Sequence, residues 1–488
     1  MPISEETFFL DPRFEGTLQS QIQQMVAEGI LSGRFLPGEK MPSSRKLAQH
    51  LGVSRLTVTL AYNELIADDY LSSRGRSGYY VSEGAPPAPE LPVGRGRDRV
   101  DWSRAIGQRF SGANQVEKPA DWEAFRYPFV YGQADPTLFD QQNWRLCALQ
   151  ALGRRDFTSM TSDYADRDDP KLVDFIARHA LPRRGILARP DEILVTVGAQ
   201  NALWLAAQIL LTQRRTAAYE NPFYPGLREI LNQTRCHLAP IEVDDEGLPP
   251  DLLPHETDVL FTTPSHQCPT AATMPLERRR ALLDRARTDD FLIVEDDYEF
   301  EMSFLTAPSP ALKSLDEDGR VIYVGSFSKS LFPGLRLGYL VGSAPFIQEA
   351  RALRSTVLRH IPGHIQRTAS YFLSRGHYDA LVRRIRDAFH ERRRVMDQAI
   401  RNHALTIAGT SRFGGSSFWM STPPGVRVDD LMPRLKARSV LVEPGTPFFE
   451  NPEQGQSFFR LAYSSIPATL IPDGLSILAE ELTRQRRA

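Results

Sequence analysis

The sequence predicts an α/β protein made of a small N-terminal unit and a much larger second unit. A stretch at residues 85–99 holds prolines followed by a Gly/Arg run, a composition that links domains rather than building a core. Apolar residues before it recur at helical spacing, whereas several apolar runs after it read as buried strands that end in polar residues. We therefore expect a first domain at residues 15–84, a linker at 85–120 and a large domain at 121–488.

The composition is ordinary for a soluble globular protein. The 488 residues are 41% hydrophobic and 24% charged, and the net charge of −2 gives the whole chain no electrostatic signature for nucleic acid or membrane. The three cysteines are widely spaced, which suggests neither a metal site nor a disulfide framework. The N-terminus lacks an apolar core of signal length and no run of about 18 apolar residues occurs, so we expect a cytoplasmic protein without a membrane span.

Three helices and a hairpin are predicted in the small unit. Apolar spacing indicates a helix from Thr17 to Leu31, and Ser43 or Ser44 can cap a short second helix that Gly52 ends. Ser54 can cap a third helix at residues 55–67, and short strands at residues 70–71 and 79–81 would flank a basic tip at residues 72–78. In the third helix we expect inward packing by Leu60, Leu65 and Ile66, and partly by Val58 and Tyr62.

The second and third helices have the arrangement that places a helix in the major groove of DNA, because a short glycine-containing turn joins them. Ser54, Arg55 and Thr57 begin the third helix and would face base edges. Residues 33–81 carry seven Lys/Arg and four acids, a local net charge of +3. A small helical dimerisation unit with solvated charges is the alternative that the spacing alone leaves open.

Longer motifs in this unit carry a family resemblance. Residues 33–48, the Leu-Gly-Val-Ser-Arg-Leu-Thr-Val run at residues 51–58 and Gly-Tyr-Tyr-Val at residues 78–81 closely resemble the GntR winged helix–turn–helix. The resemblance implies a double-stranded DNA operator as partner. Asp69 stands where that family usually has glycine, which changes the turn and leaves the contacting residues intact.

The resemblance assigns DNA contacts residue by residue. Arg45 would contact phosphate or base, Arg55 and Thr57 would read the major groove, and Arg76 and Gly78 would lie at the wing tip.

One lysine is the most informative residue of the large unit. Lys329 follows the apolar run at residues 321–324, and a lysine at a strand end is well placed to form a Schiff base with an aldehyde. Ser326, Ser328 and Arg336 can together hold a phosphate. Aldehyde and phosphate together indicate pyridoxal 5'-phosphate (PLP) as cofactor, although this motif alone equally fits a solvated loop lysine.

Two further segments fit the same cofactor. Residues 194–203 read as strand, turn and helix, so Ala199 and Gln200 can bind the phosphate through N–H groups at a helix N-terminus. Tyr224 follows the strand at residues 217–219 and can stack on a flat ring. A common α/β turn and a proline-bracketed turn are the respective alternatives.

Charged residues at two strands complete the predicted site. Asp296 lies near the end of a buried strand and can pair with the pyridine nitrogen, while the Tyr298 hydroxyl can bond the ring oxygen. A solvated strand end is the alternative. Arg460 lies inside an apolar strand and needs an anion, for which either a ligand carboxylate or a structural aspartate would serve.

Together these segments resemble fold-type I PLP enzymes of the aminotransferase class. The Thr-Pro-Ser-His-Gln-Cys-Pro-Thr-Ala run at residues 263–271 and Val-Glu-Asp-Asp-Tyr at residues 294–298 narrow the resemblance to the MocR family. It implies a winged helix–turn–helix followed by an aminotransferase class I fold with a mostly parallel central sheet. It further implies that Lys329 holds PLP, that Arg460 receives the acid group of an effector, and that Tyr164 reaches the partner's phosphate in a homodimer.

The sequence departs from the family at Cys268 and Ala271, where phenylalanine and glycine are usual. Cys268 matches the asparagine that touches the ring oxygen in true aminotransferases, which weakens the case for transamination but not for binding.

The resemblance implies a PLP-dependent transcriptional regulator. It would sense an amino compound through external aldimine formation and control genes of amino acid, amine or vitamin B6 metabolism. Family analogy suggests γ-aminobutyrate, taurine, an ectoine-derived amino acid or PLP itself as effector. Two alternatives stay open: an active aminotransferase with an accessory DNA-binding domain, and a DNA-binding scaffold whose large domain only dimerises.

Overall fold

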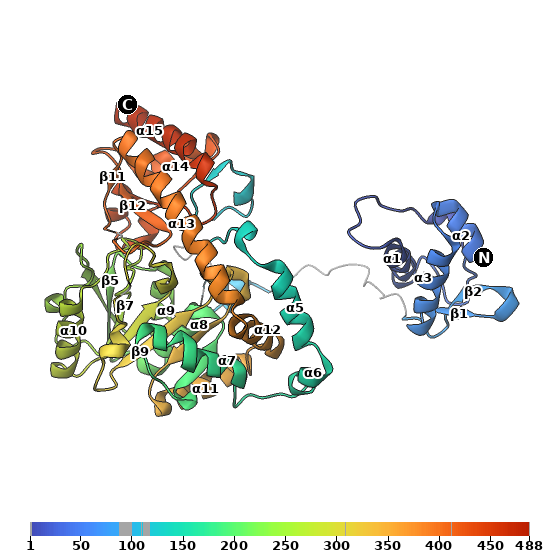
Figure 1. The fold of residues 1–488 in the computed structure, drawn as a ribbon, viewed down its shortest axis with the longest axis horizontal. Coiled ribbons are helices and arrows are strands. Elements are labelled where there is room, and N and C mark those ends of the chain that lie inside the picture. Colours follow the sequence, from blue (N-terminus) through green and yellow to red (C-terminus); the bar gives the residue numbers. More distant parts are fainter. Residues whose placement is uncertain are drawn as a thin grey trace. The chain divides into compact units, whose positions relative to one another are not determined.

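The computed structural model describes residues 2–86, 100–108, 110, 118–307, 309–410 and 412–487, without the side chains of Arg76, Ser159 and Arg487. The chain forms two compact units, Met1–Arg109 and Phe110–Ala488 (Figure 1).

The N-terminal unit is a winged helix–turn–helix, as expected. Side-chain caps begin each helix: the Ser43 hydroxyl accepts the N–H of Lys46, and the Ser54 hydroxyl accepts the N–H of Thr57. Gly52 ends the second helix at φ +67°, a left-handed conformation that favours glycine. The elements are α1 (Leu18–Leu31), α2 (Ser44–Leu51), α3 (Arg55–Ala67) and the antiparallel strands β1 (Leu71–Ser73) and β2 (Tyr79–Val81).

The buried face of α3 differs from the one predicted. Val58 and Tyr62 are fully buried and Leu65 nearly so, whereas Leu60 is exposed. The prediction for Leu60 was therefore wrong: residues 58, 62 and 65 share one face of a helix, and residue 60 lies on the opposite side. The Tyr62 hydroxyl donates to Pro42 O at 3.1 Å, which satisfies its polar atom inside the core.

Asp69 takes over the turn in which the GntR family usually has glycine. Its φ of +59° lies in the left-handed region, which aspartate tolerates better than most residues. Its carboxylate accepts a 2.8 Å hydrogen bond from the Ser82 hydroxyl, which ties the turn to the end of the wing. Aspartate thus forms this turn in a left-handed conformation and adds a side-chain bond that glycine lacks.

The large unit is built on a seven-stranded sheet of mostly parallel strands, which confirms the predicted α/β fold (Figure 1). Only β10 runs antiparallel to its neighbours within this sheet. In spatial order the strands are β4 (Ile193–Thr196), β10 (Gly338–Val341), β9 (Val321–Ser326), β8 (Leu292–Asp297), β7 (Val259–Thr262), β5 (Thr216–Asn221) and β6 (His237–Glu242).

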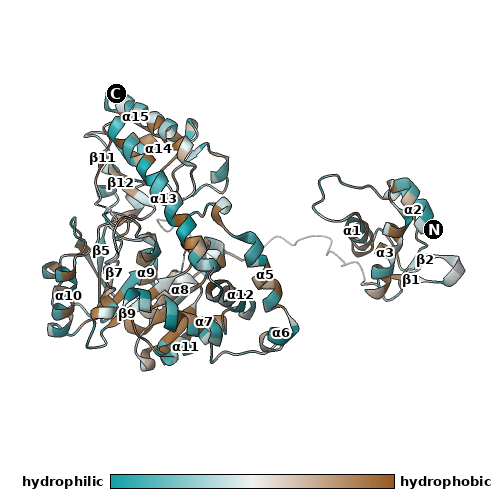
Figure 2. Ribbon diagram, in the orientation of Figure 1, coloured by the Kyte–Doolittle hydropathy of each residue, from teal (hydrophilic) through white to brown (hydrophobic). Residues whose placement is uncertain are grey.

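Helices cover both faces of this sheet. On one face Val294 and Val324 pack in a single apolar cluster with residues of α8, α9 and α11. On the other face Ile293 and Val321 pack with residues of α10. Figure 2 shows the central strands as largely hydrophobic and α10 as largely hydrophilic. The helices of this sheet layer are α7 (Pro170–Phe175), α8 (Gly198–Leu210), α9 (Pro225–Thr234), α10 (Leu276–Thr288), α11 (Ala344–Leu358) and α12 (Gly363–Ser374).

A smaller four-stranded sheet lies in the C-terminal part of the large unit. Its strands are β11 (Thr406–Ile407), β12 (Ser417–Ser421), β15 (Phe458–Ala462) and β14 (Glu443–Pro444), in that order. The antiparallel register of β14 and β15 sets Glu443 opposite Arg460. Elsewhere β3 (Tyr127–Pro128) pairs in parallel with β13 (Val440–Leu441). The remaining helices are α4 (Trp102–Ala105), α5 (Gln141–Ala151), α6 (Arg154–Met160), α13 (His377–Asn402), α14 (Val428–Ala437) and α15 (Ile471–Arg487).

Within the described ranges, no helix combines the length and apolar character that crossing a membrane requires.

Candidate functional site

A cavity of about 350 Å³ in the large unit collects the predicted cofactor residues. It lies where the carboxyl ends of β8 and β9 meet the start of α8, the usual ligand position in an α/β sheet. The predicted residues that line it are Ala199, Gln200, Tyr224, Asp296, Tyr298, Ser326, Ser328, Lys329, Arg336 and Arg460. Residues that are 261 positions apart in the chain thus share one cavity.

Lys329 projects into the cavity three residues after β9 ends. Its Nζ lies 4.0 Å from the centre of the Tyr131 ring, and a Cβ at Gly132 would come within 2.5 Å of Nζ. The φ of +75° at residue 132 lies in the left-handed region that favours glycine. Burial lowers the pKa of Lys329 to about 8, against the opposing effect of the Glu299 carboxylate. About a tenth of this amine is therefore neutral and nucleophilic at pH 7, far more than in an ordinary lysine.

Anion-binding groups gather at one end of the cavity. The Ser328 N–H donates to Ser326 Oγ at 3.2 Å, while Ser328 Oγ is buried and has no partner among the described residues. The Arg336 guanidinium lies against the start of α8, where a Cβ at Gly198 would be 3.1 Å from Nη2. Two hydroxyls, a guanidinium and the N-terminus of α8 together suit a phosphate.

Only one of the three consecutive acids at the end of β8 faces the cavity, because strand residues alternate between the two faces. Glu295 accepts the N–H groups of Leu312 and Lys313, and Asp297 forms a buried ion pair with Arg184 at 2.6 Å. Asp296 lines the cavity with Oδ1 buried and unpartnered in the described part of the chain. Burial, followed by the nearby Asp297 charge, raises the pKa of Asp296 to about 7.

Two tyrosines supply neutral hydroxyls to this cavity. Tyr224 stands at the N-cap of α9, with its hydroxyl 3.5 Å from Gln200 Oε1, and burial raises its pKa to about 12. Burial also raises the pKa of Tyr298 well above its ordinary value. Both side chains therefore stay protonated and can donate hydrogen bonds across the physiological pH range.

Arg460 has a structural carboxylate of its own. Its Nε and Nη2 both lie 2.7 Å from Oε2 of Glu443 on the neighbouring strand. Burial alone would lower the pKa of Arg460, but the Glu443 charge, Cys268, Tyr131 and the hydrogen bond to Glu443 together outweigh burial and raise it. The predicted need for an anion is thus met by a glutamate rather than an aspartate. Nη1 points toward Cys268 Sγ at 3.9 Å, and the guanidinium still lines the cavity.

Among the cavity residues that were not singled out from the sequence are Lys118, Tyr131, Gly132 and Glu443. Lys118 lies in the stretch assigned to the linker, and Glu443 lies in an apolar run that resembles an ordinary strand end. No motif marks Tyr131. One signal could have pointed to Glu443. The buried Arg460 needs an anionic partner, and Glu443 is an acid within an apolar run of the same region.

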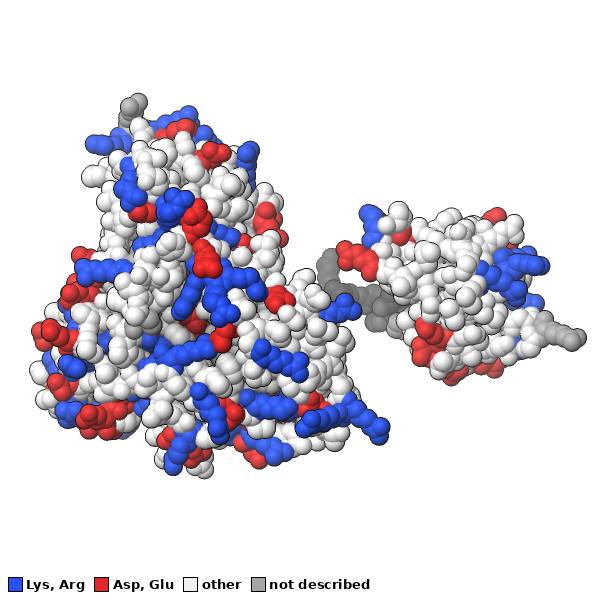
Figure 3. All heavy atoms as spheres, viewed as in Figure 1, with Lys and Arg blue, Asp and Glu red and all other residues white. Residues whose placement is uncertain are grey.

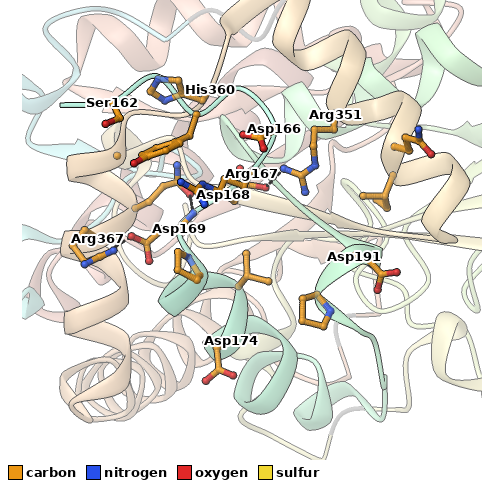
Figure 4. Close-up of a pocket in the computed structure, with 18 of the residues that line it drawn as sticks. Ser162, Asp166, Arg167, Asp168, Asp169, Asp174, Asp191, Arg351, His360 and Arg367 are labelled. Carbon is orange, nitrogen blue, oxygen red and sulfur yellow. Dashed lines mark hydrogen bonds and ion pairs between the residues drawn. The ribbon is translucent and has the colours of Figure 1, made fainter. Parts of the chain in front are cut away.

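Tyr164 lies apart from this cavity. It lines a separate cavity of about 940 Å³, with the Arg167 guanidinium 3.9 Å above its ring. Figure 4 shows that cavity and the ion pairs of Arg351 with Asp168 and of Arg367 with Asp169 at its wall.

The predicted DNA-contacting residues lie around the start of α3. Arg45 and Arg55 are exposed, and Arg55 Nε lies 3.4 Å from Ser44 Oγ. The hydroxyls of Ser54 and Thr57 lie 2.8 Å apart and bond each other, so the cap of α3 already uses both. In the view of Figure 3, Lys and Arg side chains of this unit gather at one edge, away from most of its acids.

The predicted wing tip is only partly described. Gly78 has a φ of +107°, which requires glycine, and the side chain of Arg76 lies outside what the structure describes. Within the described residues, no cluster of three or more His, Cys, Asp or Glu could hold a metal ion.

Comparisons with known proteins match both units. The model of aminotransferase class I and II matches residues 134–476, and that of bacterial regulatory proteins of the gntR family matches residues 18–81.

Three individual relatives illustrate the match. The chain is 58% identical to the HTH-type transcriptional regulator TauR of Rhodobacter capsulatus, over 99% of this chain and 100% of TauR. It is 30% identical to the probable rhizopine catabolism regulatory protein MocR of Rhizobium meliloti, over 81% of this chain and 79% of that protein. The solved structure of LysN, an α-aminoadipate aminotransferase from Thermus thermophilus complexed with N-(5'-phosphopyridoxyl)-L-leucine, covers 80% of this chain and 100% of LysN, with 26% identity and a TM-score of 0.70.

Proposed function

The chain belongs to the MocR-type transcriptional regulators, in which a GntR-family helix–turn–helix precedes an aminotransferase class I and II domain. From this premise we propose that it binds PLP at Lys329 and senses an acidic amino compound there. The supporting observation is the cavity in which Lys329, phosphate-binding groups, Asp296 and Arg460 meet.

The residues present fit pyridoxal 5'-phosphate. Ser326, Ser328, Arg336 and the start of α8 would hold the phosphate, and the unpartnered Ser328 hydroxyl supports this. The buried, unpartnered Oδ1 of Asp296 suits a protonated ring nitrogen, which would lower the pKa of that carboxyl from about 7. When bound, the cofactor supplies an aldehyde to which an amine can attach and a ring that withdraws electrons.

The tyrosines and the lysine have separate tasks in this proposal. Tyr224 would stack on the ring and Tyr298 would donate to the ring oxygen, while the Lys329 amine would be the group that attaches the aldehyde of the cofactor. Arg460, oriented from behind by Glu443, keeps its Nη1 side for the acid group of that effector. The site therefore requires an amine and an acid on one small molecule.

Sensing rather than turnover is favoured by Cys268. This residue is buried beside Arg460 and Lys329, and burial raises the pKa of its thiol to about 11. A neutral thiol donates hydrogen bonds weakly, so it does not replace the amide found in true aminotransferases at the ring oxygen. An active aminotransferase remains the alternative, and conversion of a keto acid by the purified protein would establish it.

The remaining parts of the proposal concern assembly. Residues 15–84 form the DNA-binding domain, residues 85–120 the linker and residues 121–488 the sensing and dimerising domain. Arg45, Arg55, Thr57, Arg76 and Gly78 contact operator DNA, and Tyr164 of each protomer of a homodimer completes the phosphate site of the other. The controlled genes belong to amino acid, amine or vitamin B6 metabolism.

Absorbance spectroscopy of the full-length protein tests the cofactor assignment. Wild-type protein incubated with PLP should turn yellow, and borohydride should fix the cofactor covalently on Lys329. Lys329→Ala should lose both signals, whereas Lys436→Met, which removes an exposed lysine of α14, should keep them. A yellow, borohydride-trapped Lys329→Ala protein would show that another lysine holds the cofactor.

A further inference from the structure

Tyr131 links Lys118, a second cation, to the part of the cavity that holds Arg460. Lys118 lines the cavity and its Nζ donates to Tyr131 O at 2.9 Å. The ring of Tyr131 lies 3.9 Å from the Arg460 guanidinium, and its N–H donates to Glu443 Oε1 at 3.2 Å. Tyr131 thus bonds both Lys118 and Glu443 through its backbone, while its ring lies against Arg460.

The charges at this end of the cavity do not balance. Arg460 and Lys118 are both cations, and Glu443 is the one carboxylate that contacts Arg460 among the described residues. Burial lowers the pKa of Lys118, Glu443 opposes this effect, and Arg460 adds to it, so the three groups act on one another. Among Lys118, Arg460 and Glu443, one positive charge is left over, which suits a ligand group of charge −1.

Glu443 also limits what Arg460 can do alone. Its carboxylate takes both Nε and Nη2, so a ligand acid group cannot use that edge of the guanidinium. The remaining side, which carries Nη1, faces the thiol of Cys268, a weak hydrogen-bond partner. A ligand acid held by half a guanidinium would gain much from a second cation, and Lys118 has donors beyond the one used on Tyr131 O.

We propose that Lys118 and Arg460 together bind the single anionic group of the effector, and that Lys118 sets the preference for acidic over neutral amines. The inference rests on the proposed function, because it needs an amine bound at Lys329. It adds a specificity-determining residue from outside the motifs that the two family models recognise.

Matched amines measure this preference in the full-length protein loaded with PLP. β-Alanine and n-propylamine have similar length and differ in the acid group, as do γ-aminobutyrate and n-butylamine. The dissociation constant of each is read from the change in cofactor absorbance. In each pair, the dissociation constant of the neutral amine divided by that of the acidic amine measures how much the acid group adds to binding.

Two variants separate charge from hydrogen bonding. Lys118→Gln keeps an N–H donor for Tyr131 O and removes the charge, so the ratio should fall about 10- to 100-fold, as expected of one lost charge-assisted contact. Lys118→Arg keeps the charge and should retain most of the ratio. Lys436→Met controls for removal of a distant charge, and melting temperatures report whether each variant is folded.

The other outcomes contradict the inference. An unchanged ratio in Lys118→Gln, or an equal weakening of acidic and neutral amines, would make Lys118 a structural support of Tyr131. A wild-type ratio near one would show that no acid-binding group acts in this cavity. Absence of any cofactor absorbance in wild-type protein would refute the proposed function itself and would be recognised before any amine is added.

Discussion

At the scale of single residues, the cavity is defined by buried groups whose ordinary partners are absent. Asp296 Oδ1 and Ser328 Oγ have no partner among the described residues, and Lys329 is an amine with a depressed pKa. Each such group costs folding free energy unless a ligand satisfies it. Their convergence on one cavity is the physical reason to assign it a ligand with a cation, an anion and an aldehyde.

The pKa of Lys329 predicts how PLP capture depends on pH. Because burial lowers this pKa to about 8, the neutral amine fraction rises through that pH and is nearly complete two units above it. The rate of cofactor uptake by the cofactor-free protein should therefore rise with pH, with a midpoint near 8, and then level off. Stopped-flow absorbance measures this rate, and a midpoint near 10 would mean that Lys329 is solvated like an ordinary lysine.

Arg460→Lys tests the acid-binding end of the cavity. Lysine can keep the ion pair with Glu443, but it lacks the planar fork that presents Nη1 to a ligand. An acidic amine should bind roughly ten-fold or more weakly, as expected for loss of a contact worth about 1.5 to 3 kcal/mol. PLP uptake should survive, since the residues proposed to hold its phosphate lie at another end of the cavity. Equal binding midpoints in variant and wild type would make Arg460 purely structural.

At the scale of elements, β8 shows how one strand separates structure from function. Its alternate residues face opposite ways, so Glu295 and Asp297 serve the fold while Asp296 serves the cavity. The Arg184–Asp297 ion pair lies in the interior, and the guanidinium also donates to Ser309 O and Ser265 Oγ. This network fixes the end of β8 and with it the position of Asp296.

Removing Arg184 should destabilise the large unit strongly. Arg184→Ala leaves Asp297 buried without its partner, a loss of about 3–5 kcal/mol. Arg287→Ala is the matched control, because its ion pair with Asp318 is solvent-exposed and should contribute far less to stability than the buried pair. Thermal denaturation of the full-length variants compares the two. Similar shifts of the melting temperature would mean that the buried pair adds little.

Helices and strands could be predicted from the sequence where the pattern that marks them lies within a few neighbouring residues. The caps Ser43 and Ser54 and the strand before Lys329 follow from residues close together in the chain. Leu60 was misplaced because an apolar side chain alone does not reveal its helix face. Glu443 escaped prediction because its contact with Arg460 depends on two strands pairing. Contacts of this kind arise from folding and leave no pattern of spacing.

At the scale of the whole molecule, the chain joins a helix–turn–helix unit of the gntR family to a unit of the aminotransferase class I and II family. A ligand changes DNA binding only if it binds the conformational states of the protein with different affinity, and the coupling is reciprocal. Replacement of Lys329 by an effector amine would change the contacts in the cavity, which is where such a difference would arise.

DNA binding should depend on the first 84 residues. Arg55→Ala should weaken or relax sequence preference at a cost of roughly 1–3 kcal/mol, and affinity should fall steeply with salt because phosphate contacts supply most of it. Protein lacking residues 1–84 should not bind. A footprint of the shortened protein on the same DNA would place the reading surface in the large unit instead.

The most direct test of the central claim is a titration of operator DNA, selected in vitro by the full-length protein, followed by fluorescence anisotropy. It is performed with PLP-loaded protein, with and without an amine that shifts the cofactor absorbance. The amine should change the DNA affinity of wild-type protein about 5- to 150-fold, the range of typical allosteric coupling, and leave Lys329→Ala unaffected. Equal wild-type affinity with and without a saturating amine, or an equal response of Lys329→Ala, would contradict the account.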